Sequence, residues 1–495
     1  MQLTLLLPPE EAARLQRLPI IKAARTGRMR GTAVRIVWHD SLDRALASNC
    51  LALAEERGTW RLERHRPAAT EPWPPATDHR LIEQADDLEA LRPILPEVTT
   101  PVAAFEGRRS IFPLTIDGEP VSLTVLDGSL RTVTAEQPAS RLILEGSGPA
   151  VGALAMPLAR ALSLALPEQS LATEAQCLAD ATVAKPRRAG APALMPEGLS
   201  VQAAFNHVAG HLTGVMLQLA PKVADPASGP EPVHDMRVAV RRARSALSMF
   251  PQSSPYQAPL PQAGGLDGAS LTRASEGLKR LGHMLGPARD WDVFMTETAP
   301  PIEAALPEHA SLRSLLRSGT RRRHTARAAL SEYLKGSEFR LLCLEFACLV
   351  ATEPPVPDAT QTGAGQSLTE YAAGVLRTRW KKLLNAGKDF EDLEGSDLHR
   401  LRLKVKRLRY AAEFFAPLFP GKHAARFIRR LAVLQERLGL FNDTAVAEAL
   451  LRDLNSTPGY AAGLVLGFTA ARGARSRPKI ADAWVRLRRA DPFWA

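Results

Sequence analysis

An internal repeat constrains the fold of this chain more than any other feature of its sequence. The stretch VHDMRVAVRRARSALSMF at residues 233 to 250 aligns with LHRLRLKVKRLRYAAEFF at residues 398 to 415 when it is shifted by 165 positions. The shift places His234 on His399, and basic and apolar positions coincide along the rest of the two stretches. A repeated unit of this kind predicts two similar structural halves.

On a helical wheel, each stretch keeps its apolar residues apart from its basic ones. The apolar stripe predicts a helix face that packs on a core. It comprises Met236, Val240, Ala243, Leu247 and Phe250 in the first copy, and Leu401, Val405, Leu408, Ala412 and Phe415 in the second. The basic stripe comprises His234, Arg237, Arg241 and Arg244, and then His399, Arg402, Lys406 and Arg409.

Neither basic stripe contains a carboxylate. A charged helix face is ordinarily a solvated one, but such faces mix signs because like charges four residues apart destabilise a helix. A negatively charged partner would reverse that cost. The net charge of +11 is also uneven, since residues 1 to 200 hold 22 basic and 24 acidic side chains and the remainder holds 41 and 28. We therefore expect the last three hundred residues to bind an anion.

The two histidines lie in the predicted first turns of their helices. Unpaired backbone N–H groups and the helix dipole favour anions there. A single histidine at a helix start is more often a capping or packing residue, but the recurrence of His234 and His399 at equivalent positions favours anion binding. No cysteine or acidic partner shares their spacing, so the sequence indicates no metal site and no cofactor.

A second repeated element follows each basic helix. The stretches LGHMLGPARDWDVF at 281 to 294 and LQERLGLFNDTAVA at 434 to 447 both carry Leu-Gly and, four residues after that glycine, an aspartate: Asp290 and Asp443. Each unit is thus a basic helix followed by a long partner helix. The sequence predicts an all-α region of two similar bundles related by an approximate twofold axis.

The residues before the repeat have a different pattern. Short alternating runs such as TAVRIVW and VSLTVLDGSL are separated by turn signals, and one helix is expected near residues 151 to 166. This pattern predicts an α+β domain with an antiparallel sheet. The stretch TVAKPRRAGAPALMPEGLS at 182 to 200 is typical of a linker. Helical periodicity then dominates, and Ser367 with Glu370 predicts a capping box for a helix that extends to about Phe390.

These signals predict a multidomain chain. We expect an α+β domain at 1–181, a linker at 182–196, a first helical half at 197–350, a loop at 351–367 and a second helical half at 368–495. The amino terminus lacks the basic start and the long apolar stretch of a secretion signal. The most apolar region, at 151–167, contains Arg160 and prolines and is too short for a bilayer span. We expect a cytoplasmic protein without a membrane span.

The paired basic motifs, each followed by Leu-Gly and then Arg-Asp or Asn-Asp, closely resemble the CHAD family, the conserved histidine α-helical domains, over about residues 197 to 495. The resemblance implies two helical bundles with pseudo-twofold symmetry whose basic helices face a shared groove that binds inorganic polyphosphate. It also implies association with polyphosphate or polyester granules. Carried over by position, the phosphate contacts would be His234, Arg237, Arg241, Arg242 and Arg244, and His399, Arg402, Lys406, Arg407 and Arg409.

Further basic clusters outside the two motifs could ring the same groove. Taken singly, each is better explained as a solvated helix face. We include four of these residues among the predicted polyphosphate contacts: Lys279, Arg280, Arg377 and Lys381. Two other clusters, Arg321–Arg323 and Arg426 with Arg429 and Arg430, also add positive charge to the surface.

The amino-terminal part resembles a CYTH domain, the triphosphate-tunnel fold, in its succession of a strand, an aspartate, a small helix and a second strand at residues 36 to 65. An active member would carry alternating glutamates in its first strand, where this chain has Gln2, Thr4 and Leu6. Glu55 and Glu56 stand where basic residues would grip phosphate. Without these groups metal-assisted phosphoryl transfer lacks its apparatus, so we expect a degenerate, non-catalytic scaffold.

Two other functions remain open from the residues alone. A nucleic-acid-binding protein would share the positive charge, but single-strand binders interleave aromatic residues for base stacking, and neither basic stripe contains one. A triphosphatase or polyphosphatase would act through the amino-terminal domain, against which the missing glutamates argue. Polyphosphate binding without catalysis is the function that the sequence favours, with nucleic acid as a less favoured ligand.

Overall fold

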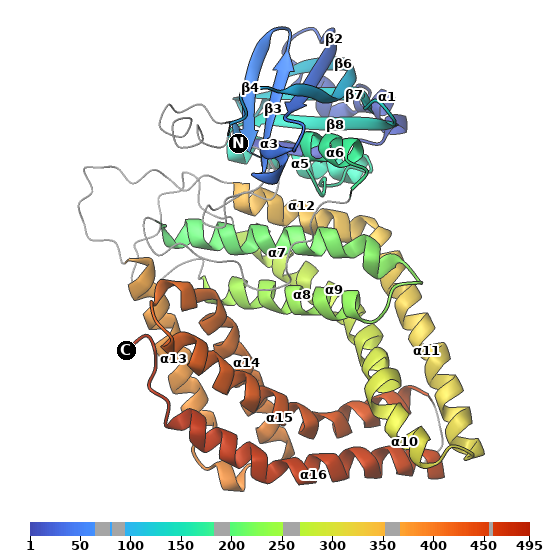
Figure 1. Cartoon of the computed structure of the whole chain (residues 1–495), viewed down its shortest axis with the longest axis vertical. Coiled ribbons are helices and arrows are strands. Elements are labelled where there is room, and N and C mark those ends of the chain that lie inside the picture. Colours follow the sequence, from blue (N-terminus) through green and yellow to red (C-terminus); the bar gives the residue numbers. More distant parts are fainter. Residues whose placement is uncertain (65–79, 82–94, 183–198, 251–267, 352–366, 455–458) are drawn as a thin grey trace.

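The computed structural model describes residues 1–64, 80–81, 95–182, 199–250, 268–351, 367–454 and 459–495 (Figure 1). An antiparallel sheet with short helices is followed by a region whose described elements are all helices, which confirms the predicted fold class. The predicted linker at 182–196 and the predicted loop at 351–367 lie, apart from residues 182, 351 and 367, outside the part of the chain that the structure describes.

The sheet has eight described strands, all antiparallel, in the order β1-β8-β7-β6-β2-β3-β4-β5. They are β1 (Gln2–Leu6), β2 (Arg30–Asp40), β3 (Leu51–Glu56), β4 (Thr59–Arg64), β5 (Arg80–Leu81), β6 (Thr100–Ile116), β7 (Glu119–Arg131) and β8 (Glu136–Gly146). The alternating runs TAVRIVW and VSLTVLDGSL lie in β2 and β7, as their period of two predicts.

The stretch VSLTVLDGSL is part of one hairpin arm and contains no turn of its own. Gly128 lies within β7 opposite Gly107 of β6, and a side chain at Gly128 would clash with the Glu106 carbonyl oxygen only 2.2 Å away. The turn of this hairpin is Asp117-Gly118, where both residues have positive φ. Such a two-residue turn matches the twist of the strands that it joins.

Helices cover both faces of the sheet. They are α1 (Pro9–Leu15), α2 (Pro19–Ala24), α3 (Ala45–Ser48), α5 (Gly148–Ala161) and α6 (Leu171–Ala179). On one face Leu3, Leu123 and Leu144 are buried in the same core as α5. On the other, Trp38 and Phe105 pack in a separate core with α6. The helix expected near 151 to 166 is therefore α5, which begins and ends a few residues earlier.

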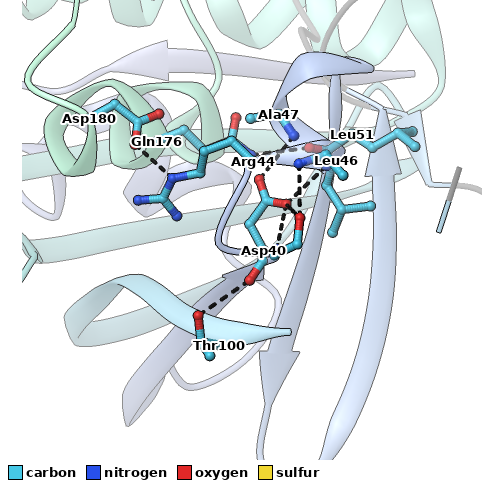
Figure 2. A network of polar contacts seen from close by, with 10 residues as sticks. Asp40, Arg44, Leu46, Ala47, Leu51, Thr100, Gln176 and Asp180 are labelled. Carbon is cyan, nitrogen blue, oxygen red and sulfur yellow. Dashed lines mark hydrogen bonds and ion pairs between the residues drawn. The ribbon is translucent and has the colours of Figure 1, made fainter. Parts of the chain in front are cut away.

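The buried carboxylate of Asp40 orders the connection between β2 and β3, and Figure 2 shows its contacts. It accepts hydrogen bonds from the backbone N–H groups of Ser41 at 2.8 Å, Leu46 at 2.9 Å and Ala47 at 3.0 Å. The bonds from Leu46 and Ala47 satisfy unpaired donors at the start of α3. In the same network Arg44 forms an ion pair with Asp180 at 2.8 Å, which ties the end of α6 to this loop.

The helical region has two halves. The first contains α7 (Val201–Ala224), α8 (Glu231–Met249), α9 (Gly268–Val293), a π-helical turn η2 (Phe294–Thr298), α10 (Ala299–Ala305), α11 (Ala310–Lys335) and α12 (Ser337–Ala351). The second contains α13 (Leu368–Ala386), η3 (Phe390–Asp392), α14 (Gly395–Phe415), η4 (Ala416–Leu418), α15 (His423–Asp453) and α16 (Tyr460–Arg488).

The halves repeat the same order of packed helices. In the first, α7 packs on α8 and α8 on α9; in the second, α13 packs on α14 and α14 on α15. Equivalent helices also contact each other across the halves: α7 with α13, α8 with α14, and α9 with α15. Contacts between equivalent surfaces are the mark of a twofold relation. The halves are thus an approximate twofold pair, as the repeat predicts.

The two apolar stripes lie in the core as predicted. Met236 and Val240 of α8 are buried, and so are Leu401 and Val405 of α14. The capping box of Ser367 and Glu370 at the start of α13 is also present. That helix ends at Ala386 and not at about Phe390, because Gly387 caps it, and glycine is a common residue at helix ends. The ring of Trp484 packs where a larger residue at position 387 would have its side chain.

The sheet domain rests on α12 (Figure 1). This helix packs against α5 and β1 on one side and against α7 and α9 on the other. Its apolar residues, among them Phe339, Leu342 and Phe346, are buried around the helix, as expected for a helix between two layers. Arg340 donates a hydrogen bond to the Leu164 carbonyl oxygen at 2.8 Å. A continuous apolar core therefore joins the sheet domain to the helical region.

Candidate anion-binding cavity

A cavity of about 550 Å³ lies where α8 and α14 meet. Among the described residues that line it, eight are cationic and none is a carboxylate. The cationic residues are Arg241, Arg244, Lys279, Arg379, Lys382, Lys404, Lys406 and Arg407. The remaining lining residues are Ser245, Ser248, Ser275, Leu403 and Tyr410. The walls come from α8, α9, α13 and α14, so both halves of the repeat contribute to one site.

The buried apolar stripes fix the direction in which the basic stripes point. Since Val240 and Ala243 are held in the core, Arg241 and Arg244 face the cavity. Arg241 donates a hydrogen bond from Nε to the Tyr410 hydroxyl of α14 at 3.2 Å. This contact joins the basic helix of one half to that of the other.

Lys406 is surrounded by positive charge. Burial first, and then neighbouring arginines of both basic helices, lower the pKa of Lys406 to about 7. The arginines that act on it are Arg402, Arg241, Arg237 and Arg409. A lysine with such a pKa is only partly charged at neutral pH, because its ammonium form lacks a compensating anion. The cavity thus holds cations in an arrangement that a bound anion would stabilise.

Arg379 of α13 reaches the cavity although it belongs to neither motif. It donates hydrogen bonds to the Arg407 carbonyl oxygen at 2.7 Å and to the Ser248 hydroxyl at 3.1 Å. Burial, and then the charge of Arg407, lower the pKa of Arg379 to about 10, so it remains charged at neutral pH. These bonds connect α13 with α14 and α8 and hold the guanidinium in a fixed orientation.

The two repeated aspartates lie beside the first arginines of the stripes. Arg237 forms an ion pair with Asp290 of α9 at 3.6 Å. In the second half burial lowers the pKa of Arg402, and the charge of Asp443 on α15 opposes that shift. In the first repeat Gly286 makes room for the arginine, because a side chain at this position would lie 3.3 Å from the Arg237 guanidinium. Neither Arg237 nor Arg402 is among the residues that line the cavity.

Two of the predicted phosphate contacts, Arg242 and Arg409, pair with a carboxylate of the protein. Arg242 is buried and pairs with Glu413 of α14 at 2.5 Å, and Arg409 pairs with the same carboxylate at 3.0 Å. Both guanidinium groups also lie over the Tyr410 ring, at 5.8 Å from its centroid. Their charge is largely compensated within the protein, and neither residue lines the cavity.

The other predicted contacts are exposed residues. Lys279 and Arg407 line the cavity, and the rest are not among its described lining residues. Arg280 forms an ion pair with Glu338 of α12 at 3.2 Å. Partial burial of the imidazole ring, and then the charges of Arg289 and Arg241, lower the pKa of His234. His399, Arg377 and Lys381 are the remaining members of this group.

Sequence reasoning missed Arg379, Lys382 and Lys404. On α13 it selected Arg377 and Lys381, but the structure brings the neighbouring Arg379 and Lys382 to the cavity. The apolar face of this helix, with Ala372 and Leu376 buried, determines its rotation. The packing of α13 on α14 determines which side of that apolar face lies next to α14. The spacing of residues within one helix cannot predict this packing.

The sheet domain has its own cavity, of about 340 Å³, between the sheet and the start of α6. Gln2 and Thr4 line it, and so does Arg109. Arg109 forms two hydrogen bonds with the Glu56 carboxylate, at 2.6 and 2.9 Å. That hydrogen bond, with the nearby positive charges, lowers the pKa of Glu56. Arg109 is thus already paired with a carboxylate.

In the described part of the chain, no group of three or more His, Cys, Asp and Glu side chains is placed to hold a metal ion. No described helix is both long and apolar enough to cross a membrane.

Comparison with known proteins places the helical region. A family model described as the CHAD domain matches residues 200–452. The chain is similar to a crystal structure of the CHAD domain from the plant Ricinus communis, with 29% identity and a TM-score of 0.49, over 62% of this chain and 99% of that one. It is also similar to PptA from Streptomyces chartreusis, with 16% identity and a TM-score of 0.41, over 58% of this chain and 98% of that one. No curated protein matches significantly.

Proposed function

The chain belongs to the CHAD domain family, and on this premise we propose that it binds inorganic polyphosphate in the cavity between α8 and α14. The composition of the cavity carries the proposal, because its described lining holds eight cations and no carboxylate. Arginine and lysine donate charge-assisted hydrogen bonds to phosphate oxygens. A flexible polyanion also releases counterions when it binds.

The electrostatics of the cavity support a polyanion as the ligand. Surface cations normally alternate with carboxylates, whereas here burial, and then the repulsion of neighbouring arginines, lower the pKa of Lys406. A row of phosphates would supply the missing negative charge and allow Lys406 to protonate fully. The fixed orientation of Arg379, which rests on bonds to α8 and α14, keeps one cationic group in place for that ligand.

Nucleic acid is a less favoured ligand for the same cavity. Proteins that bind single strands stack bases on exposed aromatic rings. Among the described lining residues Tyr410 is the one aromatic side chain, and it is buried with the Arg242 and Arg409 guanidinium groups over its ring. A bare phosphate chain needs no stacking surface.

Binding is non-catalytic in this proposal, and the sheet domain acts as a scaffold. The support lies in the polar groups of its cavity, where Gln2 and Thr4 occupy β1 and where Arg109 is engaged by Glu56. Release of phosphate from tripolyphosphate in the presence of magnesium or manganese tests this part. Turnover well above that of a protein-free sample would contradict it.

The proposed place of action is the cytoplasm, at polyphosphate or polyester granules. The proposal rests on the ligand, since a protein that binds long polyphosphate chains will collect where those chains accumulate. A fluorescent fusion of the full chain tests it, and a diffuse signal in cells that contain such granules would contradict it.

The binding experiment reverses three exposed charges of the cavity in the full chain: Arg244→Glu, Lys279→Glu and Arg407→Glu. Each of these side chains is exposed and forms no ion pair within the described part of the chain. We therefore expect the three substitutions to leave the fold unchanged. We expect the affinity for polyphosphate, measured by fluorescence anisotropy, to fall by at least about a hundredfold, since each reversal replaces an attraction with a repulsion.

A matched variant controls for net charge. Arg17→Glu, Arg313→Glu and Arg317→Glu change the same number of charges on exposed residues of α11 and of the loop after α1. We expect this variant to keep the affinity within a few-fold at physiological salt, because distant charges are screened. Equal losses in both variants would show that net charge alone governs binding and would refute the cavity as the site.

A further inference from the structure

A second basic groove lies between α15 and α16. It encloses about 430 Å³, and its described lining contains five arginines and no carboxylate. The arginines are Arg429, Arg430 and Arg437 of α15, Arg486 of α16 and Arg489 directly after α16, with Val433 and Ala483 as the other lining residues. The sequence singled out Arg429 and Arg430 as a basic cluster, but the proposed function gives them no role.

The positive charge of this groove is mostly uncompensated. The Asp482 carboxylate at its edge pairs with Arg486 at 3.0 Å and lies 3.9 Å from Arg437. Arg437 also donates a hydrogen bond to the Lys479 carbonyl oxygen. In the described part of the chain Arg429, Arg430 and Arg489 form no ion pair. One carboxylate, that of Asp482, thus contacts two of the five guanidinium groups.

The shape of the groove suits an extended phosphate ligand. Arg430 and Arg437 lie about two turns apart on α15, and Arg486 and Arg489 lie less than one turn apart at the end of α16. Their forked donors therefore line both sides of a trough. Ala483 and the buried Trp484 and Leu434 hold the helices together below it. Solvated surface arginines ordinarily alternate with acidic residues. Arginines on both sides of a trough are instead placed to donate charge-assisted hydrogen bonds to phosphate oxygens.

This groove is separate from the cavity between α8 and α14. The two share no lining residue and no helix, since the walls of the cavity come from α8, α9, α13 and α14. We propose that the groove between α15 and α16 is a second binding surface for phosphate polymers, so that one molecule holds two polymer segments. The proposal rests on the proposed function for its ligand but concerns a different surface.

A molecule with two such surfaces cross-links long polymers, whereas a molecule with one does not. The test therefore compares two properties of the full chain. Calorimetry with short polyphosphate measures how many segments bind per molecule. Light scattering with long-chain polyphosphate measures cross-linking, which should rise with added polymer and fall again when polymer is in excess.

The decisive variant is Arg429→Glu, Arg430→Glu and Arg489→Glu. We expect it to bind one short chain where the unaltered protein binds two, to keep the affinity of the remaining site, and to lose the light scattering. The cavity variant with Arg244, Lys279 and Arg407 reversed should also lose the scattering but keep the site between α15 and α16. Circular dichroism checks that both variants fold.

Three outcomes would overturn the proposal. The first is a single short chain bound by the unaltered protein, and the second is unchanged scattering in the decisive variant. The third is binding of the groove to phosphatidylserine vesicles in place of polyphosphate, which would assign it to a membrane surface. The proposed function itself would fail differently, because then the cavity variant would bind short chains as well as the unaltered protein does.

Discussion

The depressed pKa of Lys406 predicts that polyphosphate binding weakens as the pH rises above about 7. In the free protein this lysine is half-protonated near pH 7 and almost neutral at pH 9. A bound phosphate chain requires the charged form and raises its pKa back towards 10.5. Binding above pH 7 therefore takes up a proton, and the cost of that proton increases with pH.

The magnitude follows from the fraction of protonated lysine. With a pKa of about 7 in the free protein, that fraction falls about fiftyfold between pH 7 and pH 9, which corresponds to about 2 kcal/mol of binding free energy. His234 adds little in this range, because its pKa lies below the usual value and it stays neutral there. We therefore expect about a fiftyfold loss of affinity over these two pH units.

Anisotropy titrations at constant ionic strength from pH 6 to pH 9 measure this profile. Calorimetry in two buffers of different ionisation enthalpy measures the proton uptake directly. Lys406→Met should bind more weakly at pH 7 but show a nearly flat profile. Lys404→Met removes a charge from the same cavity and should keep the slope of the unaltered protein. A fiftyfold fall in affinity that persists in Lys406→Met would refute the assignment of the pH dependence to Lys406.

The lowered pKa of Lys406 also affects the stability of the free protein. An unfolded lysine keeps its proton up to about pH 10, whereas folded Lys406 loses it near pH 7. Between these values the unfolded state binds more protons, so this group makes the fold more stable as the pH rises. Polyphosphate should remove that dependence, because it restores the charge of the lysine.

Three further predictions concern stability and the charge of the site. Asp40→Ala should lower the free energy of unfolding of the sheet domain by about 3 kcal/mol in a denaturant titration, since the buried carboxylate accepts three backbone hydrogen bonds; an unchanged midpoint would contradict this. Gly387→Ala should lower the melting temperature because its methyl group would meet the Trp484 ring at 2.3 Å, whereas Gly374→Ala, in open space, should raise it; the same sign for both would be the contrary result. Asp290→Asn should tighten polyphosphate binding about two- to fivefold at low salt, because it removes a negative charge that pairs with Arg237 of the basic helix; weaker binding would argue against this account.

The repeat and its two stripes could be predicted because the buried positions of a helix recur at a fixed spacing along the sequence. Met236 and Val240, like Leu401 and Val405, lie in the core because a helix can bury one stripe and leave the other to the cavity. The equivalent order of helices then followed from the repeat itself. The capping box of Ser367 was predictable for the same reason, since it depends on residues three positions apart.

The composition of the cavity was less predictable because it depends on contacts between helices. Arg379 enters the cavity from a helix outside the motif, and only the packing of α13 on α14 brings it there. Arg242 shares the stretch with Arg241 but turns to Glu413, a residue 171 positions later in the chain. The pairing of Arg409 with Glu413 was visible as an i, i+4 spacing and could have been recognised from the sequence.

The central claim is that the cationic cavity recognises a bare phosphate chain. The most direct test measures binding of long-chain polyphosphate to the full chain at about physiological salt, with duplex DNA and single-stranded RNA as competitors in the same assay. We predict tight binding that weakens steeply with salt and that neither nucleic acid displaces at comparable phosphate concentration. Equal displacement by nucleic acid would contradict the claim, because the cavity would then be a positive surface without preference for polyphosphate.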